Sequence, residues 1–254
     1  MSFVKFENVY KRYKMGEITI NAADGVSFEI EKGEFAVIVG ASGAGKTTIL
    51  NMLGGMDTCD EGKILVDGKD IATFNKKQLT TYRRYDIGFV FQFYNLVNNL
   101  TAKENVELAT QICAHASKPE EVLKKVGLED RMSQPVGLLS GGQRQALTLM
   151  MATFNPPKLL LLDEHTAALD PATAEKVLTL TKSIVSENNL TCLMITHNMQ
   201  SALELGNRTI MMHGGNIIFD AEGEERSKLT VQDLLGKFKE NAGKELDNDR
   251  MLLV

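Results

Sequence analysis

The chain has 254 residues, 43% of them hydrophobic, and a formal net charge of −5 with both signs mixed along its length. This length suits one large α/β domain or a core with a subdomain, and the mildly acidic balance excludes a general nucleic-acid surface, which would be basic. No stretch approaches the roughly 18 apolar residues of a membrane-spanning helix, the N-terminus lacks a secretory signal, and the three scattered cysteines fit reduced thiols, so we expect a cytoplasmic protein.

The first third of the chain predicts strands that lead into a glycine-rich loop. Residues 1–34 alternate apolar and polar side chains in places, which is typical of antiparallel strands. Residues 35–39 form an apolar run that predicts a buried strand, and residues 48–53 predict a helix after the glycine-rich segment 40–47. Residues 63–70 predict a hairpin arm that turns at an Asp-Gly pair.

The rest of the chain alternates between the two kinds of element. We expect strands at 87–92, 159–163 and 191–196. We expect helices over about 101–126, with short breaks near 117–119 and 127, from about 142 to 154, and from 171 onward. This alternation predicts a mostly parallel sheet with helices on both faces, interrupted by a helical insertion over about 93–154. One amphipathic segment, 231–238, lies in the charged C-terminal tail.

The glycine-rich segment reads G-A-S-G-A-G-K-T and fits the phosphate-binding pattern G-x-x-x-x-G-K-[ST], with a strand before it and a helix after it. Glycines let the loop curl so that backbone N–H groups point at phosphate oxygens, and the helix N-terminus adds partial positive charge. Lys46 is expected to reach the β- and γ-phosphates, and the Thr47 hydroxyl to ligate Mg²⁺. The positions expected to bind nucleotide are Gly40, Ser42, Gly43, Gly45, Lys46, Thr47 and Thr48.

A second anion site is predicted where Ser140 precedes Gly141 and Gly142 at a helix start. Alone, this pattern could be a simple helix cap. Downstream, Asp163 and Glu164 end a four-leucine strand. Asp163 is placed to hold Mg²⁺, directly or through water, and Glu164 to polarise a water for attack on the γ-phosphate.

His197 follows the next predicted strand. A histidine in such a place can be a structural residue, but beside the other motifs we favour a sensor of the γ-phosphate.

These motifs, in this order, resemble the ATP-binding cassette family, the nucleotide-binding domains of transporters, over nearly the whole chain to about Gly223. The resemblance implies a P-loop NTPase core of the α/β class with a mostly parallel sheet, an N-terminal antiparallel β subdomain and an α-helical signature subdomain. It implies an ATPase domain over 1–223, with its helical subdomain at about 93–154, and a helical, charged tail over 224–254.

The resemblance also implies roles for residues. Tyr13 matches the aromatic residue that stacks on adenine, and Gln92 matches the glutamine that links the active site to the membrane partner. Gln92 would join Thr47 and Asp163 around Mg²⁺, and His197 matches the switch histidine. The family works as a head-to-tail dimer that sandwiches ATP, so Ser140 would serve the partner's nucleotide.

The two halves of the chain resemble different members of the family. Residues 83–92 are similar to cassettes of macrolide-export and lipoprotein-release systems, whereas residues 139–149 and 163–170 are similar to cassettes linked to uptake of aromatic amino acids. This suggests a hybrid joined between about 128 and 136; a natural mosaic or a divergent member is the alternative. His165 stands where most cassettes have proline, either as a plain turn residue or as a group that tunes Glu164.

From this resemblance we expect an ATPase subunit at the inner face of the cell membrane that powers a separate permease, docked near Gln92, with no nucleic-acid partner. One alternative is a regulatory ATPase whose membrane partner transports nothing, and another is an engineered hybrid with ATPase activity only. A soluble cassette in DNA repair or translation fits less well, because those usually carry twin cassettes or long coiled-coil insertions. The transported substrate and the direction of transport stay open.

Overall fold

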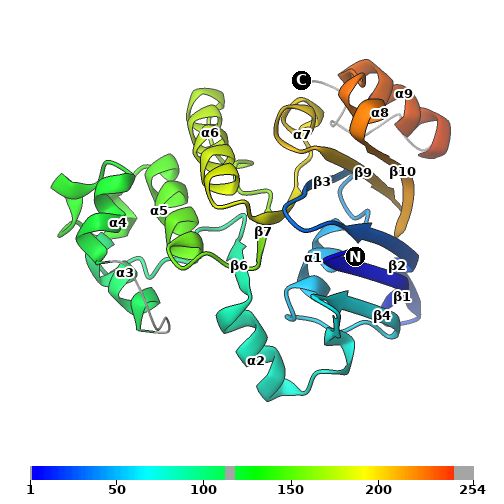
Figure 1. Cartoon of the computed structure of the whole chain (residues 1–254), viewed down its shortest axis with the longest axis horizontal. Helices are drawn as coiled ribbons and strands as arrows, with labels where there is room; N and C mark the ends of the chain where they lie inside the picture. The colour runs from blue at the N-terminus through cyan, green and yellow to red at the C-terminus, as the bar shows by residue number, and fades with distance from the viewer. Residues whose placement is uncertain (1, 112–117, 243–254) are drawn as a thin grey trace. The chain divides into compact units, whose positions relative to one another are not determined.

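The computed structural model describes residues 2–111 and 118–242 (Figure 1). The chain forms two compact units: the first combines Met1–Thr80 with Thr191–Val254, and the second is Thr81–Leu190. The sequence predicted a different division, into an ATPase domain over 1–223 with a helical subdomain at about 93–154 and a tail over 224–254. That division stays a prediction. Within the tail, residues 243–254 lie outside the described part.

The first unit contains an antiparallel sheet in the order β2-β1-β4-β5. Register places Val4 of β1 opposite Ile30 of β2 on one side and Val66 of β4 on the other. The alternation predicted for the N-terminal segment is confirmed: one face is buried, and Phe6 stacks on Phe28 with ring centroids 4.6 Å apart. The strands are β1 (Val4–Met15), β2 (Ile18–Ile30), β4 (Glu61–Val66) and β5 (Lys69–Asp70).

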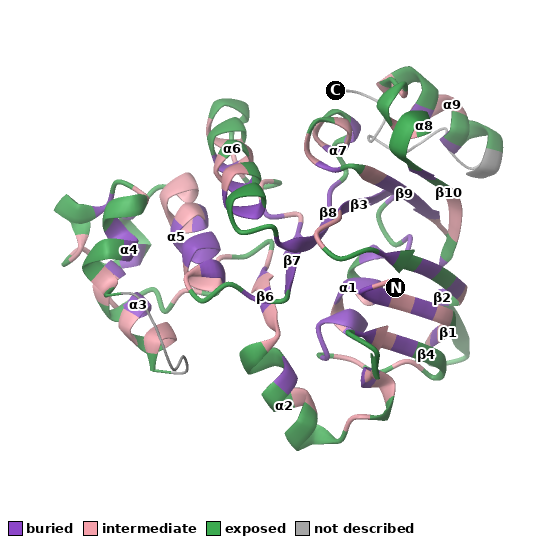
Figure 2. Ribbon diagram, viewed as in Figure 1, coloured by how far each residue is buried: buried purple, intermediate pink, exposed green. Residues whose placement is uncertain are grey.

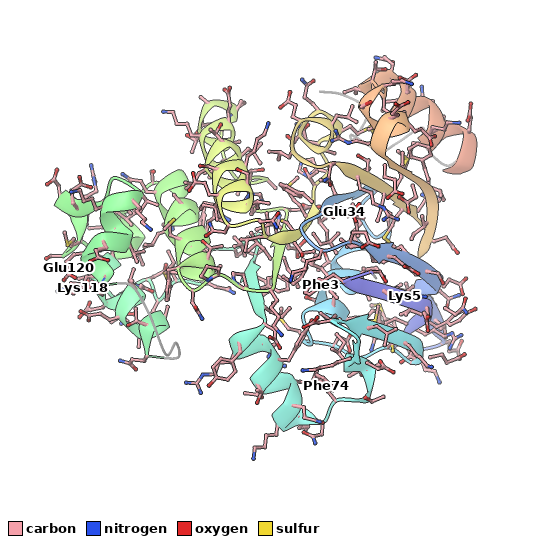
Figure 3. The ribbon with its side chains drawn as sticks, in the orientation of Figure 1. Phe3, Lys5, Glu34, Phe74, Lys118 and Glu120 are labelled. Carbon is pink, nitrogen blue, oxygen red and sulfur yellow. The ribbon has the colours of Figure 1, made fainter. Side chains whose placement is uncertain are left out.

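Charged side chains cover the exposed side of this sheet. Lys5, labelled in Figure 3, lies 3.0 Å from a carboxylate oxygen of Glu7 on its own strand and 3.0 Å from one of Glu29 on β2. The Asp-Gly turn predicted between β4 and β5 is confirmed by left-handed conformations at Asp67 and Gly68.

A second set of strands in the first unit follows the order β10-β9-β3-β8. β3 pairs in parallel with both β8 and β9, whereas β10 is antiparallel to β9. All residues of β3 and β8 are buried, as the purple strands in Figure 2 show, which explains why both segments are continuous apolar runs. The strands are β3 (Phe35–Gly40), β8 (Thr191–Ile195), β9 (Arg208–His213) and β10 (Asn216–Glu222).

Helices complete the first unit. The amphipathic segment predicted in the tail is helical and buries Leu234 and Phe238 against α7 and β10. The last helix in the list below continues from the first unit into the second. The helices are α1 (Lys46–Leu53), α7 (Met199–Leu205), α8 (Gly223–Ser227), α9 (Val231–Ala242), the 3₁₀ turn η1 (Ile71–Thr73) and α2 (Lys76–Tyr85).

The second unit pairs two parallel strands with a group of helices. The strand expected over 87–92 is too long by two residues, because pairing with β7 stops at Val90. The helical stretch expected over 101–126 consists of two helices, and residues 112–117 between them lie outside the described part. The elements are β6 (Ile87–Val90), α3 (Ala102–Thr110), α4 (Pro119–Lys125), η2 (Glu129–Arg131), η3 (Val136–Leu138), α5 (Gly141–Thr153), β7 (Leu159–Asp163) and α6 (Pro171–Glu187).

Candidate nucleotide-binding and hydrolysis site

The glycine-rich loop joins β3 to α1 in the first unit, as predicted. Gly45 has a φ of 98°, and a Cβ atom there would lie 2.0 Å from the backbone oxygen of Ala22. At Gly40 a Cβ would lie 2.2 Å from the backbone oxygen of Met212. The loop is therefore held against β2 and β9 by approaches that only glycine permits. Ser42, Gly43 and Thr47 remain exposed along it.

Lys46 is the buried charge of this loop. Its side chain is only 5% exposed, and Nζ donates to the backbone oxygens of Gly40 and Ala41, both at 2.9 Å. These bonds hold the ammonium where the strand becomes the loop. No side chain caps the N-terminus of α1, so its first backbone N–H groups suit an anionic ligand.

The turn between β9 and β10 is hydrogen-bonded to the phosphate loop, and this turn was not predicted from the sequence. The Gly215 N–H donates to the Ala44 oxygen at 3.1 Å, and the Gly215 oxygen accepts from the Asp24 N–H at 3.0 Å. The signal that could have found this turn is the Gly214-Gly215 pair between two apolar segments, a known hairpin pattern.

His197 and the phosphate loop lie at the same edge of the parallel strands. β3 and β8 pair through Ile38 and Ile195, and the Thr196 N–H donates to the Ile38 oxygen at 3.2 Å. The loop follows β3, and the exposed His197 follows β8. Parallel strands end at the same edge, so the structure brings these two predicted site elements together.

The acidic pair ends β7 in the second unit. Asp163 is 9% exposed, and Glu164 adopts a left-handed conformation with a φ of 44°. The Glu164 oxygen accepts from the Ala167 N–H at 2.9 Å, which closes the turn. A non-glycine residue held in this conformation is strained, and such strain is common at functional sites.

Gln92 emerges at the same edge as this pair. Val90 of β6 pairs with Leu162 of β7, so Gln92 and Glu164 each lie two residues beyond the last paired position. The segment after Gln92 is fastened to α5, since the Thr148 hydroxyl lies 3.0 Å from the Tyr94 oxygen and Arg144 stacks over the Tyr94 ring. The second unit thus gathers Gln92, Asp163 and Glu164.

Ser140 is the N-cap of α5, as predicted. Its hydroxyl accepts from the Gln143 N–H at 3.2 Å, and Gln143 Oε1 accepts from the Ser140 N–H at 2.9 Å. This reciprocal capping box fixes the helix start, and Ser140 itself is exposed. The structure therefore places Ser140, Gly141 and Gly142 together at the start of α5 in the second unit.

The His165 ring is buried and forms a hydrogen bond with a side chain of α6. Its Nε2 lies 3.0 Å from the Thr181 hydroxyl, which itself donates to the Val177 oxygen at 2.9 Å. The Thr181 oxygen must then accept, so His165 carries its proton on Nε2. Burial lowers the pKa of His165 from 6.5 to about 4, so the ring is neutral at physiological pH.

The strand–loop–helix unit, with its buried lysine and uncapped helix start, defines the protein as a P-loop nucleotide-binding protein. Residues 23–167 match the family described as ABC transporter. The chain belongs to this family, and it is an ATP-binding, ATP-hydrolysing subunit of an ABC transporter. In residues 2–111 and 118–242, no helix is long and apolar enough to cross a membrane.

Similar proteins agree with this assignment. A tyrosine transport ATP-binding protein of Clostridioides difficile is 39% identical over 85% of this chain and 90% of its own length. The macrolide export ATP-binding/permease protein MacB of Brucella abortus is 36% identical over 85% of this chain and 34% of its own length. A solved dimeric structure of the ATP-binding cassette MJ0796, in a post-hydrolysis state bound to ADP and Pi, has 38% sequence identity to this chain. The match covers 86% of this chain and 98% of the MJ0796 chain, with a TM-score of 0.78.

Both kinds of cassette that the halves of the sequence resemble are therefore among the similar proteins. Each match covers most of the chain. Nothing in these matches supports a join between two lineages, and the hybrid origin stays a prediction.

Proposed function

We propose that two copies of this chain form an ATP-dependent head-to-tail dimer that drives a separate membrane permease. The observation that carries this proposal is the exposed start of α5, which Ser140 caps in the second unit, whereas the phosphate loop belongs to the first. A dimer would let Ser140 of one subunit contact the γ-phosphate held by the loop of the other. The dimeric cassettes among the similar structures support this arrangement.

Mg²⁺ would be held by Thr47, Gln92 and Asp163. Their hydroxyl, amide and carboxylate oxygens are the hard donors that this ion prefers. When bound, the ion would neutralise charge on the β- and γ-phosphates. Gln92 and Asp163 fit the role because Asp163 ends β7 and Gln92 lies two residues beyond the end of its parallel partner β6.

Hydrolysis then needs a base and donors to the γ-phosphate. We assign the base to Glu164, whose carboxylate takes a proton from the attacking water while the bond between the β- and γ-phosphates breaks and ADP leaves. Lys46 and His197 would donate to oxygens of the γ-phosphate, where negative charge develops. Tyr13 would stack on the adenine.

The permease would dock near Gln92 and place the protein at the inner face of the membrane. Large apolar side chains are exposed on the second unit near this point. Two of the segments that carry these side chains, the one around Asn98 and the one around Gly137, are in contact: the Gly137 N–H donates to the Asn98 oxygen at 3.3 Å. The exposed side chains are Phe93, Val97 and Leu138.

Mixing two inactive variants tests the dimer. Ser140→Arg should leave ATP affinity of the subunit within about threefold of wild type but abolish hydrolysis, because Ser140 serves only the partner's nucleotide. Lys46→Ala lacks the loop charge but keeps the α5 start. A mixture should therefore regain one competent site per heterodimer. If the mixture is no more active than either variant alone, the head-to-tail arrangement is refuted.

A further inference from the structure

Three side chains of the first unit, those of Tyr13, Lys11 and Asp57, contact one another at the place where the Tyr13 ring is expected to stack on adenine. Tyr13 lies on β1 with 37% of its surface exposed, and its hydroxyl donates to Asp57 Oδ2 at 2.7 Å. Lys11 Nζ lies 2.8 Å from Asp57 Oδ1 and 5.2 Å from the centre of the Tyr13 ring. Each of the three therefore contacts the other two.

Asp57 is held firmly in this set. Lys11 is nearly buried and also donates to the Thr58 oxygen at 2.8 Å, while the Thr58 N–H donates to Asp57 Oδ1 at 2.7 Å. Burial opposes ionisation of Asp57, but hydrogen bonds from Lys11 and Tyr13 outweigh it and keep the pKa of this carboxyl below its usual value. The acceptor for the Tyr13 hydroxyl is thus a fixed carboxylate at neutral pH.

Asp57 also ties the ring to the phosphate loop. The N–H groups of Met56 and Asp57 donate to the Asn51 oxygen, at 2.9 Å and 3.2 Å, at the end of α1. The other end of α1 begins at Lys46. One helix therefore sets the distance between ring and loop.

The ring continues an apolar strip along the hairpin. Tyr13 pairs across the strands with Ile20, and Met15 pairs with Ile18. Directly opposed residues and next-but-one residues share a face, so these four side chains lie on one face, and all are exposed. A flat apolar surface suits a nucleobase but gives no fixed ring plane by itself.

We propose that Asp57, braced by Lys11, is a positioning residue that fixes the plane of the Tyr13 ring for stacking of the nucleobase. The inference rests on the proposed role of Tyr13 in ATP binding. A ring already held in its bound orientation loses little freedom when the base stacks on it, so affinity for the nucleoside part of ATP rises. Affinity for the phosphates, which the loop binds, is unaffected.

The test compares two probes on matched variants. Affinity for MgATP is measured by isothermal titration, and affinity for inorganic tripolyphosphate by its competition with a fluorescent ATP analogue. Tyr13→Phe keeps the ring but loses the bond to Asp57, and Asp57→Ala removes the acceptor. Asp60→Ala is the control, because Asp60 lies 4.0 Å from Lys11 and accepts from the Arg12 N–H, and so shares this neighbourhood. Thermal unfolding curves check that each variant is folded.

Tyr13→Phe and Asp57→Ala should each weaken MgATP binding about three- to tenfold, and the double variant should be no weaker than Asp57→Ala alone. Tripolyphosphate affinity should stay at the wild-type value, and Asp60→Ala should bind MgATP like wild type. Unchanged MgATP affinity in Asp57→Ala, equal losses for both probes, or losses that multiply in the double variant would overturn the inference. If Asp57→Ala does not fold, unchanged MgATP affinity in Tyr13→Phe overturns it alone.

These outcomes are separate from failure of the proposed function. If the wild-type protein binds no MgATP, the nucleotide site itself is rejected. If the wild-type protein binds MgATP and Asp57→Ala binds it equally tightly, only the role of Asp57 is rejected.

Discussion

Replacing His165 with glutamine should make the free energy of unfolding less dependent on pH between about 6.5 and 4. The ring is 3% exposed, and burial lowers its pKa to about 4 in the folded protein, against 6.5 for an ordinary histidine. Between these values the unfolded chain binds a proton that the folded chain excludes. Stability from this group is therefore fully present above pH 6.5 and is lost as pH falls through this window.

The size of the effect follows from the two pKa values. At about 1.4 kcal/mol per pH unit, the full loss amounts to about 3 kcal/mol, a large part of the stability of an ordinary domain. Other groups also titrate in this range, so the informative quantity is the difference between wild type and His165→Gln at each pH. That difference should change by about 3 kcal/mol from pH 7.5 to pH 4.

Urea unfolding followed by far-UV circular dichroism measures this difference, because the chain has no tryptophan for fluorescence. Glutamine can still donate to the Thr181 hydroxyl, so the bond to α6 need not be lost. His197→Gln is the control, since it removes an exposed histidine and leaves His165 in place; it should keep the loss of stability at low pH that His165 causes. Parallel curves for wild type and His165→Gln would refute the reasoning.

Three further variants test the site. Lys46→Ala should weaken MgATP binding about 10- to 100-fold in isothermal titration, because the buried ammonium is the point charge of the loop; wild-type affinity would contradict its assignment. Glu164→Gln should bind ATP but hydrolyse it about 10²- to 10⁴-fold more slowly and accumulate as a dimer in size-exclusion chromatography with MgATP; a monomer at high protein concentration would speak against the sandwich. Gly45→Ala should lose MgATP affinity and lower the melting temperature, because a Cβ atom there lies 2.0 Å from the Ala22 oxygen; an unchanged melting temperature would show that the loop can relax.

Much of the fold follows from local patterns. The buried parallel strands are continuous apolar runs, and β3, β7 and β8 were predicted within about two residues for that reason. Ser140 and Pro171 mark helix starts by local chemistry, a side-chain cap and a fixed φ, and α5 and α6 begin there. The phosphate loop is equally local, because glycine spacing and the following lysine carry its chemistry within eight consecutive positions.

Other features depend on contacts between segments that are distant in the sequence. The strand expected over 87–92 ends at Val90, because pairing with β7, and not the apolar run itself, sets its length. The β9–β10 hairpin was not predicted, although its turn supports the loop through Gly215. Its contribution depends on which backbone oxygen of a distant segment lies within reach, and no local pattern encodes that.

The sequence by itself determined the chemistry of this protein: a phosphate loop, an acidic pair at a strand end, and a serine that caps a helix start, each set by neighbouring residues. Only the tertiary structure decided how these groups are held. Asp57 meets Tyr13 and Lys11 across more than forty residues of chain, at 2.7 and 2.8 Å. His165 lies in the turn after Glu164, which agrees with its interpretation as a turn residue, but the sequence did not indicate that its ring is buried against Thr181 of α6. In both cases the partner comes from another element, so packing, and not spacing along the chain, sets the protonation state and the orientation of the side chain.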